Sequence, residues 1–364
     1  MSAEVVITGL GLVLPCGDGV PAAQVAWEAQ QPGFSELPEA LGSGLGGVCA
    51  AFHSGGIIPA MVNRRLDRPT RFAWVAAQEA FRDADLEPEH LGDRLAMVAG
   101  TMAGGSEAAE IFMRPYLARG PEGASPMVFP NCVAVSISGH LSTAFKFRGP
   151  SLTQIGRENS TLVALDQAVR WLRSGMADAA LVVGTDGLFP LLTELLHRTH
   201  LSAWHGLPEV GSRRGFLPGE GAQAFLLETR LRAVGRGTPI RASILGFASC
   251  ASITNDTVSR AEALQEAACS LSASPFDGWI AGSNGHRMLD DLEVPLRKAH
   301  GTWPVPKHPK LLWGEFGGSG GQLLAAALLD PSRRTLITAP ASSGSQVAML
   351  IEKEECSNPP HVLR

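Results

Sequence analysis

The sequence lacks the long apolar segments and the leader expected of membrane-spanning or secreted proteins. No apolar run in its 364 residues reaches the roughly 20 residues that cross a bilayer, so we expect no membrane span. The first ten residues, MSAEVVITGL, contain no basic stretch ahead of the apolar one. We therefore expect no signal peptide and a cytoplasmic location.

Paired cysteine motifs are absent as well. The six cysteines are scattered along the chain and form no C-x-x-C pair. This spacing predicts free thiols in a reducing compartment, and neither a disulfide framework nor a zinc site. The cysteines are Cys16, Cys49, Cys132, Cys250, Cys269 and Cys356.

The sequence has no excess of positive charge. It contains 30 Lys and Arg residues against 35 Asp and Glu residues, a net charge of −5, which argues against general nucleic-acid binding. Gly9 and Gly11 follow the first apolar stretch, but Leu14 stands where a dinucleotide-binding loop needs its third glycine. Glu194 and His197 lack the spacing of a known metal site. We expect no cofactor and no metal ion.

What the sequence does contain is a regular alternation of apolar strands and amphipathic helices. Buried strands are predicted at residues 4–14 and 179–184, and a helix capped by Asp67 is predicted within residues 63–86. Residues 310–329 are predicted to form a strand, a Gly-rich turn and a helix. The alternation indicates an α/β protein with mostly parallel or mixed sheets. The second half repeats the plan of the first, so we divide the chain into residues 1–235 and 236–364.

The most informative stretch is GPSLTQIGRENSTLVAL, residues 149–165, which has the pattern of a nucleophile elbow. A short strand would turn sharply at Gly156 into a helix capped by Asn159 or Ser160. The start of a helix favours negative charge, and a catalytic Cys or Ser is often activated at such a turn. Here the residue at the turn is Glu158.

Six stretches in order along the chain resemble the β-ketoacyl synthases of the thiolase-like fold. They are VVITGLGLVLPCGDG, RRLDRPTRFAWVAAQEA, GPSLT…STLVAL, LRSGMADAALVVG, GFLPGEGAQAFLLE and KLLWGEFGGSGG. The resemblance implies a five-layered αβαβα architecture with two related halves. It also implies a dimer that forms through the first half.

The same resemblance places the residues of the family's active site. The Cys that attacks an acyl thioester corresponds to Glu158, and the two His that support condensation correspond to Ser283 and Glu315. The family's Lys is retained as Lys310, and His286 lies three residues beyond Ser283. A carboxylate attacks thioesters poorly, a serine hydroxyl stays neutral near pH 7, and a second carboxylate opposes a developing enolate. We therefore expect no condensing activity from this chain alone.

Such a substituted member of the family resembles the chain-length factors of bacterial type II polyketide systems. These subunits pair with an active ketosynthase, shape the tunnel for the growing chain and work with an acyl carrier protein. The Cys position is typically Gln in aromatic systems, so Glu158 favours a system that makes polyenes or other reduced chains. By resemblance, the segment that crosses the dimer and lines the tunnel is Met127, Val128, Phe129, Pro130, Asn131, Cys132 and Val133.

Alternatives remain open at this point. Glu158 and Glu315 would suit a decarboxylase or acyl transferase if the fold brings them together as an acid–base pair. A third hypothesis is a homodimeric accessory protein that binds acyl chains. Independently of these functions, residues 127–133 would also suit ordinary interface packing, with no control over chain length. Four arginines lie close together in the sequence: Arg64, Arg65, Arg68 and Arg71. This arginine cluster would either dock an acyl carrier protein or form structural ion pairs.

Overall fold

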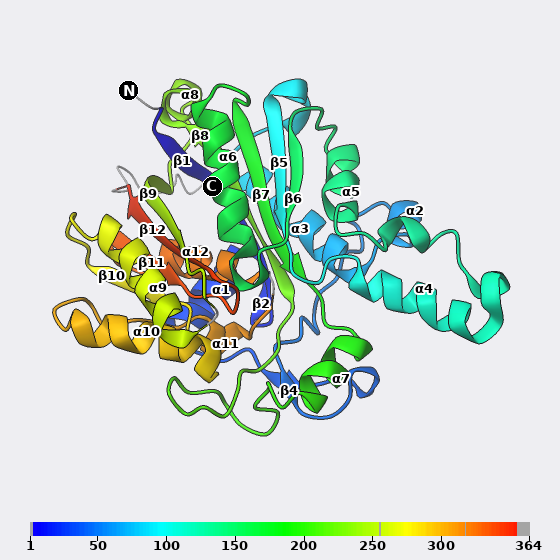
Figure 1. Cartoon of the computed structure of the whole chain (residues 1–364). Coiled ribbons are helices and arrows are strands. Elements are labelled where there is room, and N and C mark those ends of the chain that lie inside the picture. Colours follow the sequence, from blue (N-terminus) through cyan, green and yellow to red (C-terminus); the bar gives the residue numbers. More distant parts are fainter. Residues whose placement is uncertain (1–2, 255, 317, 355–364) are drawn as a thin grey trace.

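The computed structural model describes residues 3–254, 256–316 and 318–354, and shows helices packed on both faces of extended strands (Figure 1). Cys356 lies outside the described residues. Among the described residues, ten strands form one mixed sheet, and two more form a small separate pair. The strands are β1 (Val5–Leu14), β2 (Gly17–Asp18), β3 (Ser35–Glu36), β4 (Leu45–Gly46), β5 (Leu95–Gly100), β6 (Ser151–Gln154), β7 (Ala179–Asp186), β8 (Gly221–Thr229), β9 (Ala242–Ala251), β10 (Gly278–Ala281), β11 (Arg334–Ala339) and β12 (Ser345–Lys353).

The helices fill the connections between these strands. Several single-turn 3₁₀ helices accompany them, of which η5 (Phe129–Asn131) and η6 (Arg157–Asn159) concern the site. The α-helices are α1 (Val20–Glu28), α2 (Ala60–Asn63), α3 (Arg68–Asp83), α4 (Ser106–Arg119), α5 (Ser136–Ala144), α6 (Ser160–Arg173), α7 (Pro190–Arg198), α8 (Arg230–Arg236), α9 (Thr257–Leu271), α10 (Arg287–Ala299), α11 (Lys310–Trp313) and α12 (Ser319–Leu329).

The ten-stranded sheet has two parts that meet at a short junction. Its order is β10-β11-β12-β9-β1-β8-β7-β5-β6, with β2 paired to β1. β1 and β9 pair only at Val6 with Ser243 and Ile7 with Ala242. Helices α6 and α12 contact each other between the two parts, α3 and α5 cover the first part, and α9 and α10 cover the second. This arrangement confirms the predicted α/β fold with its αβαβα layers. The division near residue 235 falls in α8 and stays a prediction.

Close packing explains the glycines of β1. All ten residues of β1 are buried, and α3 lies against them with Phe72 and Trp74 buried on its two faces. A Cβ on Gly11 would lie 1.9 Å from the carbonyl oxygen of Ala76 in α3, so only glycine allows this approach. Asp67 caps α3 as predicted, by accepting a hydrogen bond of 3.2 Å from the Thr70 N–H.

The elbow has the predicted strand, turn and helix, but its predicted cap is wrong. Asn159 stands at the cap position of α6, yet its Nδ2 donates to the carbonyl oxygens of Ala339 and Ser345. The Oγ of Ser160 accepts from the Gly156 N–H instead of capping later turns. The Asn159 side chain therefore joins the elbow to the far end of the chain, while Ser160 bonds within the elbow and to Thr101.

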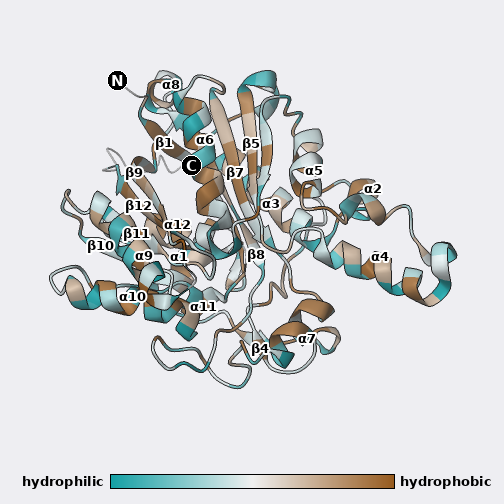
Figure 2. Ribbon diagram, viewed as in Figure 1, coloured by the Kyte–Doolittle hydropathy of each residue, from teal (hydrophilic) through white to brown (hydrophobic). Residues whose placement is uncertain are grey.

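Apolar residues concentrate in the central strands and in the helix faces turned toward them (Figure 2). The part of the chain that the structure describes contains no helix that is both long enough and apolar enough to cross a membrane. In Figure 1, α4 extends away from the sheet beside the edge strand β6. That projecting region carries exposed apolar side chains, which are considered below.

Candidate functional site

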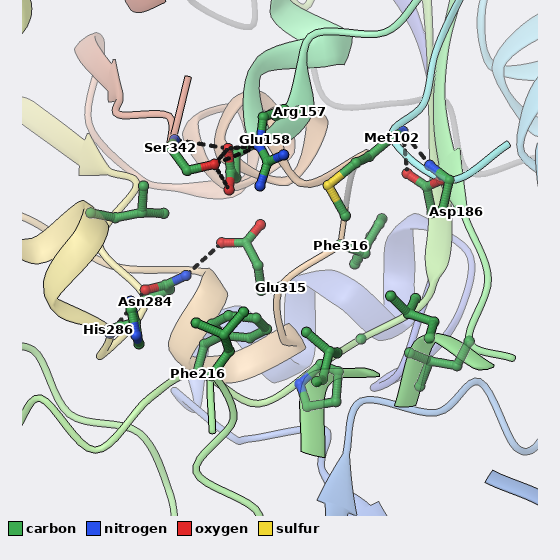
Figure 3. A pocket seen from close by; sticks show the side chains of 18 of the residues that line it. Met102, Arg157, Glu158, Asp186, Phe216, Asn284, His286, Glu315, Phe316 and Ser342 are labelled. Carbon is green, nitrogen blue, oxygen red and sulfur yellow. Dashed lines mark hydrogen bonds and ion pairs between the residues drawn. The ribbon is translucent and has the colours of Figure 1, made fainter. Parts of the chain in front are cut away.

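A cavity of about 110 Å³ lies between the elbow, the end of β7 and the loops that precede α10 and α12. Glu158, Asp186 and Glu315 lie at its wall, and Figure 3 shows Glu158 and Glu315 among the labelled side chains that line it. Most of the remaining lining is apolar: Met102, Leu188, Leu192, Leu196, Leu201, Phe216, Pro218, Met288, Leu289 and Phe316. The fold therefore brings together two carboxylates that are 157 positions apart in sequence, as one of the alternative readings requires.

Glu158 is held by the loop between β11 and β12. Its side chain is only 12% exposed, and its carboxylate accepts hydrogen bonds from the Ser342 N–H at 3.0 Å and the Ser342 hydroxyl at 2.8 Å. The Nε of Arg157 is more distant, at 4.0 Å. Glu158 is therefore neither a solvated residue nor chiefly the partner of Arg157.

Glu315 forms a buried ion pair with the retained lysine. The Lys310 Nζ lies 2.8 Å from a Glu315 carboxylate oxygen, and the side chains are 1% and 7% exposed. The Asn284 Nδ2 donates to the same oxygen at 2.8 Å. The negative charge that the sequence places at this position is therefore balanced by Lys310, and neither partner is available as a neutral donor.

Ser283 lies behind the cavity wall. It is fully buried, and its hydroxyl and N–H both donate to the same carboxylate oxygen of Glu293, at 2.5 and 2.8 Å. Burial raises the pKa of Glu293, while hydrogen bonds from Ser283 and Thr338 lower it in part. The side chains that this loop presents to the cavity belong to Asn284 and His286. The position that resemblance equates with a His therefore faces away from the site.

Asp186 is a wall residue that the sequence reasoning missed. It ends β7, and its carboxylate accepts from the Thr101 hydroxyl at 2.6 Å and from the Met102 and Ala103 N–H groups at 3.0 and 2.7 Å. Burial raises its pKa to about 6 despite these bonds. A carboxylate directly after the apolar run AALVVGT was the available signal.

The arginine cluster divides into two parts. Arg68 and Arg71 are half-buried; the Nε of Arg68 donates to Glu220 at 2.9 Å, and the Nε of Arg71 is buried. Arg64 and Arg65 are exposed. Docking of an acyl carrier protein by this cluster stays a prediction, with Arg64 and Arg65 as its exposed members.

Beside Arg68, Glu107 should give a measurable pH dependence. Burial raises its pKa to about 7, and the nearby carboxylate of Asp67 adds to this. A carboxyl group whose pKa rises on folding stabilises the fold at low pH and loses that contribution as pH rises through 7. Relative to wild type, Glu107→Gln should gain about 3 kcal/mol in free energy of unfolding between pH 4.5 and 8, at about 1.4 kcal/mol per pKa unit. Urea unfolding at the two pH values measures this gain. Glu122→Gln, at an exposed glutamate, is the control. A stability difference between Glu107→Gln and wild type that does not change with pH would contradict the prediction.

The segment at residues 127–133 is anchored by one residue and exposed at others. Asn131 is buried, and it binds the Arg65 carbonyl at 2.5 Å and His140 at 2.8 Å. Met127 and Phe129 are 63% and 62% exposed, and Phe129 packs on Phe112 with ring centroids 5.4 Å apart. These described residues lie outside the cavity lining, and their role in a tunnel stays a prediction.

The carboxylates of the cavity raise the question of whether it could hold a metal ion. In the ranges that the structure describes, no group of three or more His, Cys, Asp or Glu side chains is placed to bind one. The cavity carboxylates are each engaged by protein donors, as given above. The cavity is therefore better suited to an apolar group than to a cation.

Comparison with known proteins identifies the scaffold. The family model described as "Beta-ketoacyl synthase, N-terminal domain" matches residues 2–233. The chain is 29% identical over 268 residues to 3-oxoacyl-[acyl-carrier-protein] synthase 2 of Staphylococcus aureus (strain COL), covering 67% of this chain and 62% of that synthase. It is 30% identical over 322 residues to nodulation protein E of Rhizobium sp. (strain N33), covering 82% of this chain and 77% of that protein.

Solved structures agree on the fold over nearly the whole chain. The ishigamide ketosynthase/chain length factor superposes with a TM-score of 0.85 at 22% identity, covering 98% of this chain and 100% of that one. A β-ketoacyl synthase from Burkholderia phymatum STM815 gives a TM-score of 0.84 at 17% identity, covering 97% of this chain and 100% of that one. At 22% and 17% identity, the structural likeness establishes the fold alone. Membership of the family rests on the family model that matches residues 2–233.

Proposed function

Because the chain belongs to the β-ketoacyl synthase family, we propose that it is a non-catalytic subunit that pairs with an active ketosynthase and shapes the acyl-chain tunnel in type II polyketide biosynthesis. One observation carries the proposal: the three substituted active-site positions all serve the structure. Glu158 binds Ser342, Glu315 binds Lys310, and Ser283 binds Glu293. The Ser283 hydroxyl donates to Glu293 and the two carboxylates accept hydrogen bonds, so these three side chains do not support the role of a nucleophile or an oxyanion donor.

The exposed edge of the sheet supports pairing with a second subunit. β6 is the last strand of the sheet, and an edge strand offers unpaired N–H and C=O groups to another chain. Ile155, directly after β6, is 64% exposed, and Val133, Val135 and Phe129 are exposed nearby in the chain. Contiguous exposed apolar residues commonly mark protein interfaces.

The proposal extends to the other partners and to the product class. The name of the ishigamide structure joins a ketosynthase with a chain length factor, and we assign the second role to this chain. The pair would act in the cytoplasm on chains carried by an acyl carrier protein, with Arg64 and Arg65 as the docking residues. Within the pair, Phe129 and Met127 would set the depth of the tunnel. Glu158 in place of Gln favours polyene or other reduced products.

The test is co-purification with a ketosynthase that has an intact Cys-His-His set and is encoded next to this chain. We expect a stable complex, and Ile155→Asp should weaken it by about tenfold or more because it places a charge in an apolar contact. Val305→Asp is the matched control, and it should leave the complex unchanged. Val305 is also exposed, but it lies two residues before Lys307, which pairs with β10 at the opposite end of the sheet from β6. Failure of the wild-type chain to associate would contradict the proposal.

A second candidate function rests on the shared cavity. Glu158 and Glu315 both line it, so an enzyme of altered chemistry, such as a decarboxylase or acyl transferase, is the alternative. It predicts turnover of a carrier-bound acyl substrate by the isolated chain, with loss in Glu158→Ala or Glu315→Ala. A homodimeric acyl-binding accessory protein predicts self-association without turnover. The same purified protein distinguishes these outcomes.

A further inference from the structure

The loop between β11 and β12 is held by three consecutive elbow residues. The Nε of Arg157 donates to the Ser342 hydroxyl oxygen at 2.6 Å, and Glu158 accepts from both the N–H and the hydroxyl of Ser342. Asn159 donates to the carbonyl oxygens of Ala339 and Ser345, the residues on either side of the loop, at 2.9 and 3.2 Å. These contacts join residues that are 180 to 186 positions apart in sequence, so they are purely tertiary.

Glu158 makes the central contact of this set. Its carboxylate oxygens accept the Ser342 N–H and hydroxyl, and hydrogen bonds to an ionised acceptor are stronger than neutral ones. The Arg260 Nη1 on α9 holds the Ser342 carbonyl oxygen from the other side, at 3.1 Å. Neither a Cys nor a Gln at position 158 offers the same set, because a thiol is a weak acceptor and an amide has one acceptor oxygen.

The position of this contact relates it to the cavity. Glu158, Arg157 and Ser342 all line the cavity, and Figure 3 shows Ser342 and Glu158 joined at its upper wall. Arg157 has φ of 53°, the left-handed conformation that costs a non-glycine residue energy. The turn that presents a nucleophile in the family thus presents a carboxylate to the loop here.

We propose that Glu158 is a positioning residue that clasps residues 340–344 against the elbow, at the wall of the cavity. At the position that resemblance equates with the family's nucleophile, the carboxylate of Glu158 thus holds the loop through Ser342. The inference rests on the contacts of this loop and holds whether or not the chain pairs with a ketosynthase.

Hydrogen–deuterium exchange of the full chain tests the clasp, because Glu158 itself protects the Ser342 amide. Glu158→Ala should accelerate exchange in peptides covering residues 340–344 by roughly tenfold or more, since it removes a charged acceptor. Glu158→Gln keeps one acceptor oxygen and should give a smaller acceleration. Peptides from β7 should be unchanged in both, which separates local release from global unfolding.

The control is Asp166→Ala, which removes a carboxylate from α6, the helix that follows the elbow. That carboxylate pairs with Arg170, also on α6. It should leave the loop at the wild-type rate. If Glu158→Ala does not fold, Ser342→Ala removes the hydroxyl bonds from the other side and should accelerate exchange severalfold. Wild-type exchange at residues 340–344 in a folded Glu158→Ala or Ser342→Ala variant would overturn the clasp. Because the readout is local, that result would leave the proposed pairing standing.

Discussion

Replacing Lys310 by methionine is expected to lower the free energy of unfolding by about 3–5 kcal/mol. Lys310 and Glu315 lie 2.8 Å apart and are almost completely buried, so the substitution leaves a carboxylate in the interior without its cation. The Asn284 amide still donates to Glu315, but one neutral donor offsets only part of the cost of a buried charge. Urea unfolding followed by circular dichroism at pH 7 measures the loss.

A double substitution separates the missing charge from the missing side chain. Lys310→Met combined with Glu315→Gln removes both charges and retains an amide at position 315, so it should recover much of the lost stability. The exposed pair Lys146–Glu89 supplies the control, because Lys146→Met should change stability little. Equal losses in the single and double variants would show that Lys310 stabilises the fold by packing and not by its charge.

By resemblance, Lys310 corresponds to the lysine of the family and Glu315 to the position of a histidine. A lysine kept in the interior needs an anion or a strong acceptor nearby. Glu315 supplies that anion within the same turn between α11 and α12. Glu315 therefore stabilises Lys310 in the interior.

The architecture was predictable because its signals are local. The buried strand expected at residues 4–14 is β1, that at 179–184 is β7, and the helix capped by Asp67 is α3. Each follows from apolar periodicity or a cap within a few residues. The strand predicted at the start of residues 310–329 was wrong, because the apolar run there forms α11, a four-residue helix that ends at Gly314 with φ of 85°. Short apolar runs do not distinguish helix from strand.

The site was less predictable because its contacts are distant in sequence. Glu158 was found from the elbow pattern, but its partner Ser342 is 184 positions away. Arg68 is half-buried and pairs with the buried carboxylate of Glu220, 152 positions on. Ser283 matched a catalytic position by alignment, yet its orientation is set by Glu293 on α10. Local sequence indicates which residues occupy the site but not the direction in which they point.

Restoring a thiol at the elbow with Glu158→Cys is not expected to create condensing activity. Condensation needs donors that stabilise a developing oxyanion, and loss of one such donor typically costs about 10²–10³ in rate. Both family positions for these donors are affected here, since the Ser283 hydroxyl binds Glu293 and Glu315 is a carboxylate bound to Lys310. We therefore expect a rate about 10⁴-fold or more below that of an active synthase.

The measurement combines the Glu158→Cys chain with a partner ketosynthase whose own Cys is replaced by Ala. Malonyl thioester consumption and carbon–carbon bond formation should both stay at background. Alkylation by iodoacetamide, mapped to the peptide that carries position 158, shows that the new thiol is reachable, so inactivity cannot be ascribed to a closed loop. Turnover above background would mean that other wall groups, with Asn284 the nearest to Glu315, supply the missing donors. In that case one substitution at the elbow, and not the loss of the whole constellation, would separate this chain from an active synthase.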